Sequence, residues 1–360
     1  MRLPEALMQS LFEQTGQALS QTAEARARQW QGRHVKVIDG SSVLISDTPS
    51  NQKAYPQHPN QQPGCGFPIV KLLVVFSLSS AAAIAVRMTD YWTSEVELAR
   101  AWYRTLGQND VVLADRAYGS YLDLVLVRRQ CADALFRMHQ HRHHDFRRGQ
   151  RLGKADHLVT WHRPRQRPRW MALADFRALP KQLKVREIRF SLARRGQRTR
   201  VVVLVTTLLD ANAYPKATLA ELYGLRWQAE INLDHIKTTL GMEKLDNQSP
   251  AMVRKAIYAH LMVYNLLRHL VEQAAPLADV HPWRLSLQGA GQSFNHYRPL
   301  AVHQPSEHAR WQQLLLQMIA LDVVPLRPNR HEPRVKKQRP KSFPRMRKPR
   351  TVLKHKLGAA

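Results

Sequence analysis

Cysteine is scarce in this sequence, with only Cys65 and Cys131 among 360 residues. Neither lies at zinc-site spacing from a second cysteine or a histidine, so the sequence excludes a disulfide framework and a structural zinc centre and suits a reducing cytoplasm. Long apolar runs are also missing. The most apolar stretch, residues 69–86, contains Lys71 and several serines, which excludes a membrane-spanning helix and favours two β-strands.

Acidic residues are few compared with basic ones. The chain has 55 Lys and Arg against 27 Asp and Glu, a net charge of +28. This potential favours a polyanionic partner, of which nucleic acid is the commonest and a membrane surface the lesser alternative. The excess is densest in residues 326–360, which hold 13 Lys and Arg, one acid and five prolines. Such a segment is predicted to be disordered and to wrap DNA.

One segment, residues 222–245, combines groups that suit phosphodiester chemistry. It places Tyr223, Arg226, Glu230 and Lys237 at offsets of 3, 7 and 14 residues, which span an arc of roughly 60° on one helix face. Such chemistry needs a divalent ion held by oxygen ligands and cationic groups that grip the strand. The alternative is an ordinary amphipathic helix with a solvated charged face, and the spacing alone leaves both open.

Two aspartates are predicted at strand ends upstream of this segment. Asp39 follows the strand-like run 34–38 and precedes a turn that begins at Gly40, and Asp115 closes the apolar run 111–114. Either aspartate alone is more simply explained as a turn or helix-capping residue. Together with Glu230 they make a candidate carboxylate triad.

The spacing Tyr, two residues, Arg, three residues, Glu, six residues, Lys resembles the signature of the IS4 family of bacterial transposases, and the similarity extends over nearly the whole chain. The resemblance implies an α/β fold: an RNase H-like core with a mixed sheet flanked by helices, interrupted by a β-rich insertion. It also implies a role for each site residue: Asp39, Asp115 and Glu230 as catalytic metal ligands, and Tyr223, Arg226 and Lys237 as DNA-binding groups.

The same resemblance implies the cofactor and partners. Two Mg²⁺ ions would be bound by the triad, with Asp39 between them, and oxygen ligands accept Mn²⁺ as well. The enzyme would cut double-stranded transposon ends and join them to target DNA, as a homodimer in a synaptic complex and through a hairpin intermediate. No membrane partner is expected, and the predicted location is the cytoplasm, in association with the nucleoid.

The predicted β insertion carries basic turns and two tryptophans. Its arginine-rich turns, 163–169 and 194–198, would contact phosphates without reading bases. Trp161 and Trp170 either stack on a flipped base, as in some family members, or pack in the β core, which is the commoner role of tryptophan. A histidine run is flanked by arginines, which favours a phosphate-contacting loop over a metal site. The run comprises His139, His141, His143 and His144.

The expected organisation has six parts, and 44% apolar content is enough for a large core. Only 38 residues precede Asp39, whereas the family commonly has a further N-terminal region that recognises the inverted repeats. A truncated, non-catalytic DNA-binding remnant or inhibitor of transposition is therefore an alternative, and a basic RNA- or ribosome-associated protein is a third. The predicted parts are a helical segment 1–33, core 34–135, β-rich insertion 136–210, core 211–275, C-terminal helices 276–325 and the basic tail 326–360.

Overall fold

The structure is a computed structural model that describes residues 3–192, 200–325 and 346–358. Its centre is a ten-stranded mixed sheet with the order β3-β2-β1-β4-β5-β9-β8-β7-β6, in which β10 also pairs with β1. Strands β3, β2 and β1 are antiparallel, and β1, β4 and β5 are parallel. The strands are β1 His34–Ile45, β2 Ile69–Ser77, β3 Ala83–Thr89, β4 Asp110–Ala114, β5 Asp133–Arg137, β6 Gln150–Gly153, β7 Asp156–His162, β8 Gln182–Leu192, β9 Arg200–Thr206 and β10 Lys244–Leu245.

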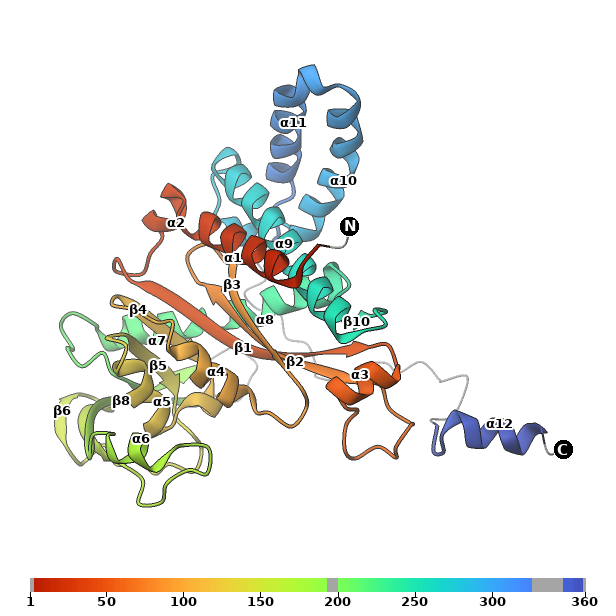
Figure 1. Ribbon diagram of the computed structural model, residues 1–360. Helices are drawn as coiled ribbons and strands as arrows, with labels where there is room; N and C mark the ends of the chain where they lie inside the picture. Colours follow the sequence, from red (N-terminus) through yellow and green to blue (C-terminus); the bar gives the residue numbers. More distant parts are fainter. Residues whose placement is uncertain (1–2, 193–199, 326–345, 359–360) are drawn as a thin grey trace.

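Helices cover both faces of this sheet (Figure 1), so the predicted α/β architecture, a mixed sheet flanked by helices, is confirmed. The α-helices are α1 Glu5–Ser20, α2 Ala23–Ala27, α3 Pro49–Ala54, α4 Glu95–Tyr103, α5 Tyr121–Arg128, α6 Leu173–Arg177, α7 Lys216–Gly224, α8 Trp227–Asp234, α9 Pro250–Ala274, α10 Leu287–His303, α11 His308–Leu321 and α12 Arg350–Gly358. Short 3₁₀ turns occur at Arg116–Tyr118, Ala275–Ala278, Pro282–Arg284 and Pro305–Glu307, and a π-turn at His235–Thr239.

Alternation along β1 assigns its side chains to two separate apolar layers. Val35 and Val37 are buried on the face covered by α1, α8 and α9, whereas Ile38 is buried on the face covered by α4 and α5. The long helix α9 is fastened to the edge strand β3, because Asn265 accepts from the backbone N–H of Ala83 and donates to its carbonyl, both at 2.9 Å. Asp39 is two residues after Val37, so its side chain lies on the same face of the sheet and faces α8.

The prediction that β1 breaks at Asp39 is wrong. The strand runs without interruption through this position because its antiparallel partner β2 continues, with Asp39 opposite Val74 and Gly40 opposite Leu73. On the other side, the parallel pairing with β4 stops at Val37 opposite Leu113. Asp39 thus lies inside a strand, just beyond the end of the neighbouring strand.

Strands β6 to β9 continue the core sheet through an antiparallel joint between β9 and β5, where Thr206 lies opposite Leu135. The region predicted as a β-rich insertion is rich in strands and extends the same sheet. The turn 194–198 lies outside the described residues. The limits of this and the other predicted domains stay predictions.

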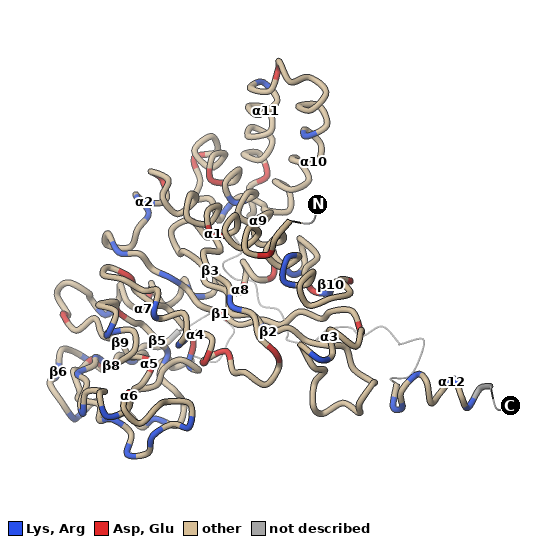
Figure 2. The backbone as a smooth tube through the Cα atoms, in the orientation of Figure 1, with Lys and Arg blue, Asp and Glu red and all other residues tan. Residues whose placement is uncertain are grey.

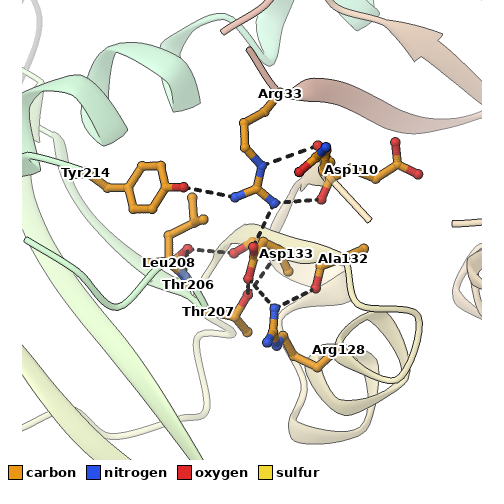
Figure 3. A network of polar contacts seen from close by, with 11 residues as sticks. Arg33, Asp110, Arg128, Ala132, Asp133, Thr206, Thr207, Leu208 and Tyr214 are labelled. Atoms are coloured by element: carbon orange, nitrogen blue, oxygen red, sulfur yellow. Dashed lines mark hydrogen bonds and ion pairs between the residues drawn. The ribbon is translucent and has the colours of Figure 1, made fainter. Parts of the chain in front are cut away.

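A polar network ties the joint together at the end of the sheet where β1, β4 and β5 begin (Figure 3). The Asp133 carboxylate binds Arg33 Nη2 at 2.7 Å and Arg128 Nη1 at 2.8 Å, and Thr207 Oγ1 donates to it at 2.7 Å. Arg33 also donates to the hydroxyl of Tyr214 at 3.1 Å. Asp39 and Asp115 lie at the opposite end of these parallel strands, so this network serves the fold.

The C-terminal part begins with α10 and α11, an antiparallel helix pair that projects from the body (Figure 1). Residues 326–345 of the predicted disordered tail lie outside the described residues. For Arg350–Gly358 the expectation of disorder is wrong, because this piece follows the last proline of the tail and forms α12. Among the described residues, no helix is both long and apolar enough to cross a membrane.

Candidate active site

The parallel pairing of β1 and β4 brings two carboxylates to the same edge. Asp115 is the first residue after β4, and its Oδ1 accepts the backbone N–H of Ala117 at 2.8 Å, which starts a 3₁₀ turn. Asp39 stands on β1 just past the end of β4, and its Oδ1 accepts the N–H of Gly40 at 3.0 Å. The carboxyl ends of parallel strands are a common place for functional groups.

Glu230 reaches this edge from the first turn of α8. Burial raises the pKa of Asp39 to about 6, the Arg226 guanidinium and the Gly40 amide oppose this shift, and the charges of Glu230 and Asp115 add to it. Glu230 and Asp115 therefore lie near enough to Asp39 for their charges to raise its pKa. Like charges held this close disfavour simultaneous ionisation unless a cation lies among them.

The predicted single helix through residues 222–245 is wrong in two places. The α-helical bonding tightens between α7 and α8, where the N–H of Arg226 bonds to the carbonyl of Tyr223 at 3.1 Å. It widens again in the π-turn His235–Thr239. Each change shifts the angular position of the residues that follow, and π-turns occur often at functional sites.

These irregularities divide the four signature residues. Arg226 forms an ion pair with Glu230, and its side chain also interacts with Tyr223, whose hydroxyl pKa is raised chiefly by burial. Lys237 lies half-buried in the π-turn, and in the part of the chain that the structure describes no ion pair joins it to the carboxylates. Tyr223, Arg226 and Glu230 therefore form one cluster, and Lys237 stands two turns away from it.

The chemistry of the donor set fits a hard divalent cation. All three donors are carboxylates, which Mg²⁺ and Mn²⁺ prefer. Within the described ranges, no three Asp, Glu, His or Cys side chains are already gathered as ligands of one metal ion, and Arg226 occupies Glu230. Glu230 would have to exchange Arg226 for the cation, which makes Arg226 the counter-charge of the metal-free site.

A fourth carboxylate borders the site and was missed by sequence reasoning. Glu95 opens α4, and its carboxylate lies so close to Gly40 that a Cβ there would overlap it. Burial raises the pKa of Glu95, Lys71 opposes this shift, and Asp115 adds to it. The glycine directly after Asp39 was the available signal, because a residue without a side chain leaves room for another group to approach the strand closely.

Replacing Asp39 by asparagine is expected to stabilise the metal-free protein. A pKa of about 6 in the folded state exceeds the unfolded value of about 3.9, so between these values the folded state holds more protons. Stability contributed by Asp39 is thus lost as the pH rises through this window, and the penalty is complete above it. The variant should gain about 1–2 kcal/mol at about pH 8 and almost nothing at about pH 4.

Urea unfolding in the presence of a chelator measures this difference. The matched control is Asp47→Asn, which removes a carboxylate from an exposed position after β1. Equal stability of the Asp39 variant and the parent at about pH 8 would contradict the prediction, because it would mean that the ionised carboxylate costs nothing in the folded state.

The two tryptophans of the insertion differ in environment. Trp161 is 4% exposed, its Nε1 donates to Glu187 Oε1 at 2.7 Å, and the Arg142 guanidinium covers its ring at 3.6 Å. Trp161 therefore packs in the β core, because both its ring and its indole N–H have partners within the protein. Trp170 is 41% exposed and has Arg100 over its ring at 4.2 Å, so a stacking role stays a prediction for that residue.

Comparison with known proteins identifies the family of the chain. The family model described as "Transposase DDE domain" matches residues 30–266, a range that contains all the signature residues and both aspartates. The chain therefore belongs to the DDE transposase family. It is similar to the transposase InsG of insertion sequence element IS4 from Escherichia coli K12, with 29% identity over 326 residues, which cover 88% of this chain and 70% of that protein. The predicted membership of the IS4 family is thus confirmed.

Among solved structures, a piggyBac transposase synaptic complex with hairpin DNA matches 80% of this chain at 8% identity and a TM-score of 0.43. The chain spans about half of that structure's chain, 52% of its length.

Proposed function

We propose that this protein is the transposase of an insertion sequence, which cuts the DNA at the ends of its element and joins those ends to target DNA. The observation that carries the proposal is the convergence of Asp39, Asp115 and Glu230 from β1, the end of β4 and α8, with Arg226 as their counter-charge. Three neighbouring carboxylates are suited to hold a divalent metal ion once Glu230 has exchanged Arg226 for it. A non-catalytic DNA-binding protein has no need of this arrangement.

The roles of the residues follow from their positions. Asp39, Asp115 and Glu230 would hold Mg²⁺ or Mn²⁺, two ions in the full proposal, and the bound metal would activate the attacking oxygen and stabilise the leaving one. Arg226, released from Glu230, would be free to bind a phosphate of the DNA strand, because a guanidinium matches the geometry of phosphate oxygens. Tyr223 is placed beside it, and Lys237 would contact the strand farther along.

The proposed partners are double-stranded DNA, as transposon end and as target, and a second copy of the chain in a synaptic dimer. Support comes from the charge of +28 and from basic turns around α6 and β6 (Figure 2). Phosphate contacts by such turns supply affinity without sequence choice.

The experiment that tests the proposal is Mg²⁺-dependent nicking of the element's own terminal DNA by the purified protein, with Asp115→Ala as the inactive variant. The expected result is cleavage at the 3′ transposon end that requires both the metal and Asp115. Salt-sensitive DNA binding without cleavage at any metal concentration would instead favour a regulatory, non-catalytic DNA-binding protein.

A further inference from the structure

A cavity of about 470 Å³ is lined by residues that begin at Gly119, four residues after Asp115. One wall is the segment 119–122, which contains the start of α5, and the other is the histidine-rich loop after β5. The polar side chains of the second wall are His139, His141, Arg142 and His143. The cavity thus joins a strand terminus of the catalytic centre to the β-rich region.

The two walls are held together by close backbone packing. A Cβ at Gly119 would come within 2.5 Å of the carbonyl oxygen of Arg137 and 3.3 Å of the amide nitrogen of His139. Only glycine permits this approach. Arg116, the residue after Asp115, also donates from Nη1 to Gln140 Oε1 at 2.9 Å. The position of the histidine loop is therefore tied to the segment that carries Asp115.

Several groups that line the cavity can donate hydrogen bonds. Tyr121 and Leu122 open α5, and the first amides of a helix have no acceptor within the helix. Nδ1 of His139 accepts the backbone N–H of His141 at 3.3 Å, which leaves the proton of His139 on Nε2. The rings of His139 and His141 lie 5.0 Å apart. Two imidazoles and a helix N-terminus that point into one space match an anion.

Two acids on the elements that form the cavity walls are each paired with an arginine. Asp123, in the first turn of α5, is fully buried and binds Arg100 Nε at 2.8 Å and Nη2 at 3.1 Å. Asp145, in the histidine loop, is held by Arg147 at 2.9 Å. Arg142 adds a guanidinium to the cavity wall. A soft-metal site is disfavoured, because among the described residues the histidines are not gathered as metal ligands.

We propose that this cavity binds one phosphate group of the DNA strand that passes Asp115, and so sets the register of the strand in the catalytic centre. The inference rests on the proposed function. Its donors and cations recognise a phosphate without reading a base, and its attachment to the residue after Asp115 fixes that phosphate relative to the reacting one.

The test scans the transposon-end DNA with single methylphosphonates, each of which removes the charge of one phosphate. The variant is His141→Ala with His143→Ala, and both side chains are exposed, so folding is preserved. The control is Arg104→Gln, which removes the charge of an exposed side chain just after α4 that does not line the cavity. Thermal unfolding of all three proteins verifies that the fold is intact.

In the parent and in the Arg104 control, one methylphosphonate position near the cut is expected to weaken binding about tenfold, and in the double histidine variant this position should have no effect. If the DNA were cleaved but methylphosphonates had the same effect at every position in all proteins, the proposed phosphate site would be ruled out. The proposed DNA cleavage would still stand. Loss of both binding and cleavage in the parent would overturn the proposed function as well. Inorganic phosphate is titrated separately, and its binding to the cavity without any sensitive DNA position would assign the site to free phosphate and overturn the proposal.

Discussion

Replacing Glu230 by glutamine is expected to abolish DNA cleavage while DNA affinity is retained. The substitution keeps the size of the side chain but removes one of the two carboxylates whose charges act on Asp39, and a neutral amide is a poor ligand for a hard divalent cation. We expect the cleavage rate to fall by about 1,000-fold or more, which corresponds to ~4 kcal/mol of transition-state stabilisation. Affinity depends on many Lys and Arg contacts and should stay within about twofold.

The matched control is Glu221→Gln, which makes the same chemical change at an exposed position of α7. It should leave both cleavage and binding unchanged. The measurement is single-turnover nicking of terminal DNA with saturating Mg²⁺, accompanied by a binding titration. A Glu230 variant that keeps more than about a tenth of the parent rate would remove Glu230 from the catalytic role. A parent that binds but never cleaves would favour the alternative of a non-catalytic remnant or inhibitor.

The sequence predicted much of the fold because periodicity and turn residues carry that information. The strands β2 and β4 lie where the apolar runs 69–86 and 111–114 predict them. The error at Asp39 has a tertiary origin. A run of Asp, Gly and two serines favours a turn locally. The antiparallel partner β2, however, continues past this run and pairs with the residues before and after it. Strand pairing therefore overrides the local preference.

The candidate site was predictable as a set of residues and not as a geometry. Spacing and family resemblance identify which residues belong to the site, namely the carboxylates and Arg226. They do not give the positions of these side chains relative to one another. The approach of Glu95 to Gly40 joins elements that are distant in sequence, and the tightened turn before α8 and the π-turn around Lys237 are departures from regular helix that residue spacing does not reveal. Nothing in a window of ten residues encodes such contacts, so the angular relation of Lys237 to Glu230 could not be predicted.

The second large effect is expected from the buried ion pair that links the β-rich region to the signature segment. Arg186 on β8 is fully buried, and its Nε lies 2.8 Å from Oδ1 of Asp156, which is 5% exposed. Arg186 also donates to the carbonyl oxygen of Tyr214 at 2.6 Å. Tyr214 lies just before α7, so this arginine fixes the start of the segment that carries Tyr223 and Arg226.

Replacing Asp156 by alanine should lower the free energy of unfolding by about 3–5 kcal/mol, because it leaves a guanidinium buried without its counter-charge. The exposed pair of Asp145 and Arg147 is the control, and Asp145→Ala should change the free energy of unfolding far less, because solvent screens an exposed pair. Urea unfolding of both variants measures the difference. A double variant, Asp156→Leu with Arg186→Met, removes both charges and should regain most of the loss. If the single and double variants were equally unstable, packing volume and not the unpaired charge would be the cause, and the ion pair would lose its assigned role in positioning α7.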